Sequence, residues 1–159
     1  MKVYVASSFR NDRQPAVVAM LRQAGHQVYD YRNPDVEGPG AAPGAGFGWE
    51  QVHPSDEAWT PLAYLEALRH PLAVEGFAAD WAAMQWADRF VLVLPCGRSA
   101  HLEAGYAVGA GKPLAILIDR SDPGAPELMY KTASLVTASH SGLLSWFDTT
   151  LPNGRSSRP

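Results

Sequence analysis

The sequence lacks the residues that would indicate a disulfide, a zinc site or a nucleic-acid polymer as partner. Cys96 is the only cysteine among 159 residues, so no disulfide can form within one chain and no cysteine-based zinc set exists. The five histidines are scattered without ligand spacing, and we expect no metal site. Charged residues make up only 18% of the chain, the net charge is -3, and the only basic run is the short tail from Arg155 to Pro159. This balance argues against a nucleic-acid polymer as partner.

Long apolar runs are also absent. No stretch is long enough to cross a bilayer, and Met1 is not followed by a charged region, an apolar run and a small-residue cleavage site. We therefore expect a cytoplasmic protein without a membrane partner. The length predicts a single domain over residues 1–150, with 151–159 as a flexible tail.

The chain does contain short apolar runs that alternate with helical patterns. Strands are predicted at 2–6, 27–30, 90–94, 113–118 and 134–138, helices at 14–24, 62–69, 72–87, 100–110 and 141–149, and a helical turn at 127–131. Such alternation implies right-handed crossovers and a parallel sheet. The prediction is a three-layer α/β fold with a five-stranded, mostly parallel sheet in the flavodoxin-like order 2-1-3-4-5.

Residues 33–61 are rich in proline and glycine and have no periodicity, so this segment is either a functional lid or disordered. Phe47, Trp49 and Trp59 make pure disorder less favourable, because large aromatic side chains in a loop need a surface to bury against. The glycines neither follow a strand nor open a helix, which excludes a dinucleotide-binding fingerprint.

Glu103 lies in the first turns of the predicted helix after the central strand. Ligands of an open parallel sheet collect beyond the carboxyl ends of the strands, so residues 98–103 should overlook the binding crevice. If Ser99 caps this helix, a capping-box glutamate belongs at position 102, a position that Leu102 occupies. Two interpretations remain open: Glu103 stabilises the helix dipole, or it is an ionised nucleophile.

Asp80 is the second carboxylate of interest, because it lies in an otherwise apolar helical segment and is costly to bury without a partner. Asp88 follows eight residues later on a similar face, with Met84 between them. We interpret Asp88 as a structural cap. Two carboxylates are the minimum for cleaving a glycosidic bond by a retaining route.

Polar residues follow two adjacent strands and lead into helices: Ser7, Ser8 and Arg10 after the first strand, and Arg98 and Ser99 after the central one. Such turns bind anions through N–H groups, hydroxyls and arginine side chains, which would favour a nucleotide over a nucleoside. Plain helix capping with solvated arginines explains the same residues equally well.

Three further residues have structural explanations that we favour. Cys96 near His101 suggests a thiol nucleophile, but no third group orients the pair, and a small buried residue is the commoner role. Gly105 and Gly109 are four apart on one helix, which indicates close packing on the sheet or on a neighbouring subunit.

The central stretch resembles the nucleoside 2-deoxyribosyltransferase family and its relatives that hydrolyse the N-glycosidic bond of nucleotides. The likeness spans residues 2–131. It depends on the YVASSFR start, Asp80 eight residues before Asp88, the strand ending at Pro95, and the run from Glu103 to Ala107 followed by Gly111-Lys112-Pro113.

The resemblance implies that Glu103 forms a covalent ribosyl or deoxyribosyl intermediate, that Asp80 serves the base or the leaving-group proton, and that no cofactor is needed. It also implies that segment 127–130, including Met129, reaches a neighbouring subunit's active site in a homo-oligomer. On this hypothesis the substrate is a nucleoside or nucleoside 5'-monophosphate, and the sugar passes to water or to another base. The substrate-binding residues are then Ser7, Ser8, Phe9, Arg10, Tyr31, Trp49, Met84, Gly97, Arg98, Ser99 and Met129, with Phe9, Tyr31 and Trp49 stacking on the base.

Two departures from the family pattern affect the expected substrate. The transferases carry an acidic residue where this chain has Gly97-Arg98-Ser99, which argues against transfer to another base and favours hydrolysis that tolerates a phosphate. Glu127 stands where the subunit-crossing segment of the family has an asparagine, so we expect different contacts to the 5' end of the sugar. A nicotinamide-cleaving hydrolase and a nucleotide-binding module without turnover remain alternatives.

Overall fold

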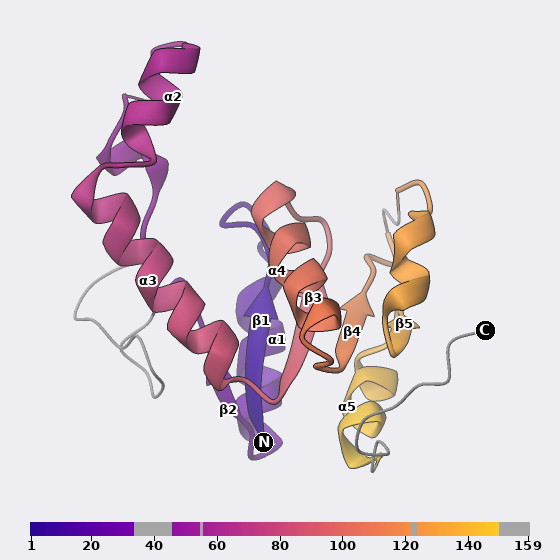
Figure 1. Ribbon diagram of the computed structural model, residues 1–159. Coiled ribbons are helices and arrows are strands. Elements are labelled where there is room, and N and C mark those ends of the chain that lie inside the picture. Colours follow the sequence, from indigo (N-terminus) through magenta and orange to yellow (C-terminus); the bar gives the residue numbers. More distant parts are fainter. Residues whose placement is uncertain (34–45, 55, 122–123, 150–159) are drawn as a thin grey trace.

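The computed structural model of the chain describes residues 1–33, 46–54, 56–121 and 124–149, and its core is a parallel sheet of five strands (Figure 1). The strand order is β2-β1-β3-β4-β5, and all four pairings are parallel. The strands are β1 (Lys2–Ala6), β2 (Gln27–Tyr29), β3 (Arg89–Val93), β4 (Leu114–Leu117) and β5 (Leu135–Thr137). This order confirms the predicted three-layer α/β, flavodoxin-like fold.

The side chains of β1 alternate between two separate apolar layers, as the two-residue period of a strand requires. Val3 and Val5 pack on one face of the sheet with the buried residues of the first and last helices. Tyr4 and Ala6 pack on the other face. Because both faces are covered, the central strand β3 is buried along its whole length.

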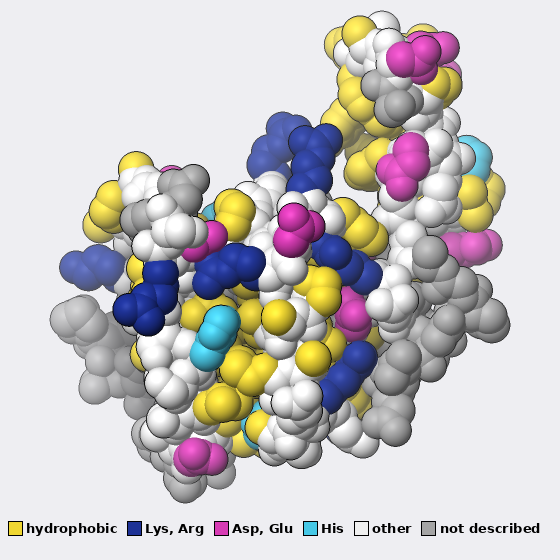
Figure 2. Space-filling view, turned by 180° about the vertical axis from the view of Figure 1, so that it is seen from behind, with side chains coloured by type: hydrophobic (Ala, Val, Ile, Leu, Met, Phe, Trp, Pro, Cys, Tyr) yellow, Lys and Arg dark blue, Asp and Glu magenta, His cyan; other side chains and the backbone are white. Residues whose placement is uncertain are grey.

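The helices form the two outer layers. They are α1 (Gln14–Gln23), α2 (Pro61–Ala67), α3 (Pro71–Trp86), α4 (Arg98–Gly109) and α5 (His140–Asp148), with short 3-10 turns η1 (Trp49–Gln51) and η2 (Leu128–Thr132). In Figure 1, α3 and α4 cover the front of the sheet, while α2 and the first part of α3 project from the body as an arm. The opposite face appears in Figure 2, where a hollow separates this arm from the body.

Local signals explain where several helices begin and end. Thr60 and Ser139 accept N-capping hydrogen bonds at α2 and α5, and Pro71 occupies the first turn of α3. Gly25 and Gly111 have positive φ angles of 84° and 71° directly after α1 and α4, where a left-handed residue ends a helix at low cost.

Two expectations near the central strand were wrong in detail. Ser99 is not the N-cap of α4, because the helix begins at Arg98 and Gly97 occupies the capping position. Asp88 does not share a helical face with Asp80, because α3 ends at Trp86. Asp88 instead accepts a 3.0 Å hydrogen bond from the backbone N–H of Lys2, which agrees with the structural role predicted for it.

The predicted lid over 33–61 lies partly outside the described residues, as does the whole tail at 151–159. Its described part contains only the short turn η1, in agreement with the absence of periodicity. Within the part of the chain that the structure describes, no helix is long and apolar enough to span a bilayer.

Candidate active site

Two half-buried carboxylates come from helices that cover the same face of the sheet. Asp80 lies in the second half of α3 and Glu103 in the second turn of α4. Both helices run back towards the sheet edge opposite the carboxyl ends of the strands, so Glu103, in the first half of α4, lies nearer the edge where ligands of such folds bind than Asp80 does. The two side chains are close enough for the charge of Asp80 to act on Glu103, so the structure brings together the two residues that the sequence singled out.

A pair of tyrosines forms the floor beneath these carboxylates. Tyr4 of β1 and Tyr29 of β2 are direct partners in the parallel ladder, and their rings stack with centroids 5.4 Å apart. The Tyr29 hydroxyl donates a 2.8 Å hydrogen bond to Asp80 Oδ1. The Tyr4 hydroxyl is buried beside Glu103 and favours its ionised form, but it makes no hydrogen bond of standard geometry within the described residues.

The electrostatics of the pair differ from those of exposed carboxylates. Burial, together with the negative charge of Asp80, raises the pKa of Glu103 to about 7, and the Tyr4 hydroxyl opposes this rise. Burial also raises the pKa of Asp80, while the hydrogen bond from Tyr29 lowers it. Near neutral pH, Glu103 is therefore divided between a protonated form and an ionised, nucleophilic form.

The alternative nucleophile, Cys96, is poorly suited to the role. Its Sγ lies 3.6 Å from Nδ1 of His101, but burial and the charge of Glu103 raise the pKa of the thiol to about 12. The thiol therefore stays protonated at neutral pH. The two ring nitrogens of His101 also contact the Gly97 carbonyl and the Tyr130 hydroxyl, each at 2.9 Å. These contacts fix the imidazole ring and indicate a structural role for it.

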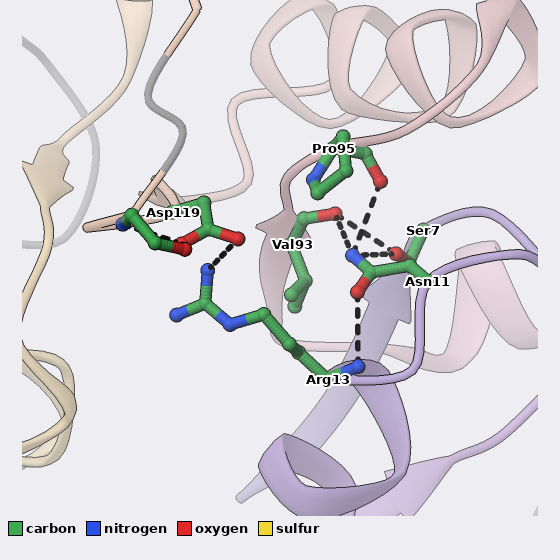
Figure 3. A network of polar contacts seen from close by, with 7 residues as sticks. Ser7, Asn11, Arg13, Val93, Pro95 and Asp119 are labelled. Atoms are coloured by element: carbon green, nitrogen blue, oxygen red, sulfur yellow. Dashed lines mark hydrogen bonds and ion pairs between the residues drawn. The ribbon is translucent and has the colours of Figure 1, made fainter.

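The turn after β1 is fastened to the end of β3 by Asn11, as Figure 3 shows. Its buried Nδ2 donates to Ser7 Oγ at 3.0 Å and to the carbonyls of Val93 and Pro95 at 3.2 and 3.1 Å. Ser7 Oγ itself donates to the Val93 carbonyl at 2.8 Å. The Ser7 hydroxyl therefore makes hydrogen bonds within the fold. Its contact with a substrate stays a prediction.

Arg32 supports the same turn from the side of β2. Its Nη2 donates to the carbonyls of Ser8, Phe9 and Asn11 at 3.0, 2.6 and 3.0 Å. Phe9 is exposed and packs edge-on against the buried Tyr31 ring, with centroids 4.9 Å apart. One face of Phe9 therefore has protein behind it while the side chain remains open to a ligand.

Trp49 belongs to a different aromatic group from Phe9 and Tyr31. Its ring contacts Phe47 and Trp59, with centroid separations of 4.9 and 5.9 Å. Phe47 in turn lies against Gly76 of α3, where an added Cβ would approach the Phe47 Cβ to 2.7 Å. Gly76 is one helical turn before Asp80, so Phe47 packs on α3 one turn away from this carboxylate.

The remaining predicted residues occupy several positions. Met84 is buried in the apolar layer under α3, and packing alone explains its side chain. Arg10, Arg98 and Ser99 are exposed near the carboxyl edge. Arg98 and Met129 line a groove of about 600 Å³ together with His101, Leu102, Glu127 and Tyr130. Among the described residues, no group of histidine, cysteine or acidic side chains could hold a metal.

Sequence reasoning missed the supporting residues of this site: Tyr4, Tyr29, Asn11, Arg32 and Lys112. Lys112 Nζ donates to the carbonyls of Met84, Gln85 and Ala87 at 2.6 to 2.8 Å, which caps the C-terminus of the helix that carries Asp80. The strand period could have found the two tyrosines, because both occupy buried strands and end in a polar group.

Comparison with solved structures finds two proteins that this chain resembles over most of its length. A 2-deoxyribosyltransferase from the psychrotolerant bacterium Bacillus psychrosaccharolyticus matches with a TM-score of 0.55 and 19% identity, over 91% of this chain and 90% of the other. A CMP N-glycosidase of Clostridium botulinum matches with a TM-score of 0.46 and 14% identity, over 93% and 98% of the two chains. No protein-family model and no curated protein matches the sequence. The first likeness establishes a shared fold.

Proposed function

We propose that this protein is an enzyme that cleaves the N-glycosidic bond of a nucleoside or nucleoside 5'-monophosphate, with Glu103 as nucleophile. One observation carries the proposal: two half-buried carboxylates on neighbouring helices, close enough to affect each other's charge, lie over a pair of tyrosines from the sheet. The shared fold with a deoxyribosyltransferase supports the same chemistry.

In the first step, a Glu103 carboxylate oxygen attacks the anomeric carbon, the bond from that carbon to the base nitrogen breaks, and the base leaves with the bonding electrons. Asp80 supplies the proton that the departing base requires, in the form of the pair in which Asp80 holds the proton and Glu103 is ionised; burial of Asp80, which raises its pKa, favours that form. In the second step, water or another base attacks the same carbon and releases Glu103, and the proton lost by the incoming nucleophile returns to Asp80.

The two halves of the substrate have separate recognition groups in this proposal. Phe9, backed by Tyr31, offers an exposed ring for stacking on the base, and Trp49 extends the aromatic surface along α3. The exposed side chains of Arg10 and Arg98 are available to a 5'-phosphate, with Ser8, Gly97 and Ser99 nearby in sequence.

The test is incubation of purified protein with nucleosides, their 5'-monophosphates and a free acceptor base, followed by chromatography of the products. We expect base release by the unaltered protein and at least a thousandfold loss in Glu103→Ala, with no loss in the exposed control Glu75→Ala. Unchanged release by Glu103→Ala would remove the mechanism. Nicotinamide release from NAD alone, or thermal stabilisation by nucleotides without product, would instead select one of the two alternatives.

The proposed enzyme is a homo-oligomer, as the resemblance implies for segment 127–130. Leu128 and Met129 of η2 are 75% and 69% exposed, so these large apolar side chains lack cover within one chain. Such exposure supports a contact with another subunit.

A further inference from the structure

A short segment, residues 46–49, lies directly on the residues that follow β2, and we call it the strap. The backbone N–H of Gly46 donates to the carbonyl of Arg32 at 3.4 Å. A Cβ added to Gly46 would collide with the carbonyl oxygen of Tyr31 and would lie 3.3 Å from Cζ of Phe9. The strap therefore begins beside the exposed ring that the proposed function assigns to the base.

The next residue of the strap, Phe47, packs on helix α3. A Cβ added to Gly76 of α3 would lie 2.7 Å from Cβ and 3.0 Å from Cγ of Phe47, closer than two side chains can approach without a shift. Glycine at position 76 therefore permits a contact that a larger residue would prevent. The half-buried Phe47 ring also meets Trp49 edge-on, with centroids 4.9 Å apart. These two contacts hold the ring in place.

The contact with Phe47 is on the face of α3 that is turned towards the sheet. Residues at intervals of three or four along a helix share one face, and on this face they are Ala73, Gly76, Asp80 and Ala83. The two alanines are buried, which identifies the face as the inward one. Because α3 runs back from the ligand edge of the sheet, Phe47 lies on the same face as Asp80 and one turn nearer that edge.

The carboxylate pair and the strap follow one another across the sheet from β1 to the end of β2. Glu103 lies beside the tyrosine of β1 and Asp80 beside that of β2, so a sugar bound at Glu103 directs its base past Asp80 towards the strap. We propose that Phe47, seated on Gly76, closes the far end of the base site and restricts the substrate to a base with a single ring. This inference rests on the proposed function, because it takes the sugar to bind at Glu103.

Binding measures this preference without any need for turnover. The probes are uridine and adenosine 5'-monophosphate, which differ only in the base, and the protein is the full chain with Glu103→Gln, titrated by calorimetry. We expect the uridine nucleotide to bind about tenfold more tightly, and the further substitution Phe47→Ala to remove most of this preference by strengthening the binding of the adenosine nucleotide. The matched control Phe77→Ala removes an exposed ring from the same helix and should leave the preference unchanged. Circular dichroism should be the same for all variants.

A second substitution tests the seat of Phe47 on α3. Gly76→Ala should push the strap away from the helix and into the base site, which weakens the binding of both nucleotides by about fivefold. Gly109→Ala adds the same methyl group to α4 where no atom lies within 4 Å, and should leave binding unchanged.

The proposal would be overturned if neither nucleotide binds, if the adenosine nucleotide binds as tightly as the uridine one, or if Phe47→Ala keeps the preference. Binding by Gly76→Ala that equals that of Gly109→Ala would also overturn it. The expected preference, together with no base release by the unaltered protein, would support the base site and contradict only the chemistry of the proposed function.

Discussion

The Tyr29 hydroxyl donates a hydrogen bond to Asp80 Oδ1 at 2.8 Å. A residue of strand β2 therefore holds a carboxylate of helix α3 that is 51 positions away in the sequence. Tyr4, the partner of Tyr29 in the β1–β2 ladder, has its hydroxyl beside Glu103. Each of the two carboxylates therefore has one tyrosine hydroxyl beside it. Only the Tyr29 pair makes a short hydrogen bond, and this difference separates the environments of the two acids.

Removing that hydrogen bond should alter the titration of Asp80. In Tyr29→Phe, the ionised carboxylate loses its donor, so the pKa of Asp80 rises further above its ordinary value. If Asp80 gives a proton to the leaving base, the falling limb of the kcat/KM profile should move to higher pH. Profiles of base release measure the shift, and Tyr64→Phe, which alters an exposed tyrosine, should leave the profile unchanged.

Stability should depend on pH through Glu103. The folded pKa of about 7 lies above the unfolded value of about 4.3, so the folded protein holds the proton more tightly. The stabilising contribution of the protonated form is complete below about pH 4 and is lost as pH rises through about 7.

The neutral variant Glu103→Gln should therefore exceed the unaltered protein in stability at pH 8 by up to about 3 kcal/mol, and match it near pH 4. Urea unfolding at both pH values measures this difference. The exposed control Glu75→Gln should show no such pH dependence. Equal stability of Glu103→Gln and the unaltered protein at pH 8 would contradict a raised pKa.

Asn11 should be one of the most sensitive polar positions. Its side chain is buried and donates to three acceptors that join the turn after β1 to the end of β3. Asn11→Ala leaves the carbonyls of Val93 and Pro95 without this donor and should lower the free energy of unfolding by about 2–3 kcal/mol. Asn33→Ala, at an exposed asparagine, should cost less than about 1 kcal/mol. Similar midpoints for the two variants in urea would count against this role.

Lys112 should affect both stability and activity. Lys112→Met removes three donors from the last carbonyls of α3 and should destabilise the fold by about 1–3 kcal/mol. Because α3 carries Asp80, base release should also fall, through kcat more than through KM, even at temperatures where the variant is fully folded. Steady-state kinetics at temperatures below the thermal unfolding transition measures the changes in kcat and KM separately. Arg69→Met, at an exposed arginine after α2, should change neither kcat nor KM.

The residues alone were sufficient to predict the architecture. Periodic apolar runs, Gly25 as a helix end and the alternation of strands with helices indicated the five-stranded order that the structure confirms. These signals are local: a strand period, a helix cap and a turn depend on neighbours a few positions away. Asp80 and Glu103 were also identified from the sequence, because a carboxylate in an apolar helix and one at a strand-helix junction are conspicuous in any linear reading.

Only the tertiary structure decided what surrounds those carboxylates. The hydrogen bonds from Tyr29 to Asp80, from Asn11 to Pro95 and from Lys112 to Ala87 join residues that are 51, 84 and 25 positions apart. It also showed that Ser99 lies inside the helix and that Gly105 and Gly109 face outwards. The pKa of a carboxylate depends on how deeply the group is buried. The sequence pattern does not give that depth, because it depends on how several elements that are distant in the sequence pack around the side chain.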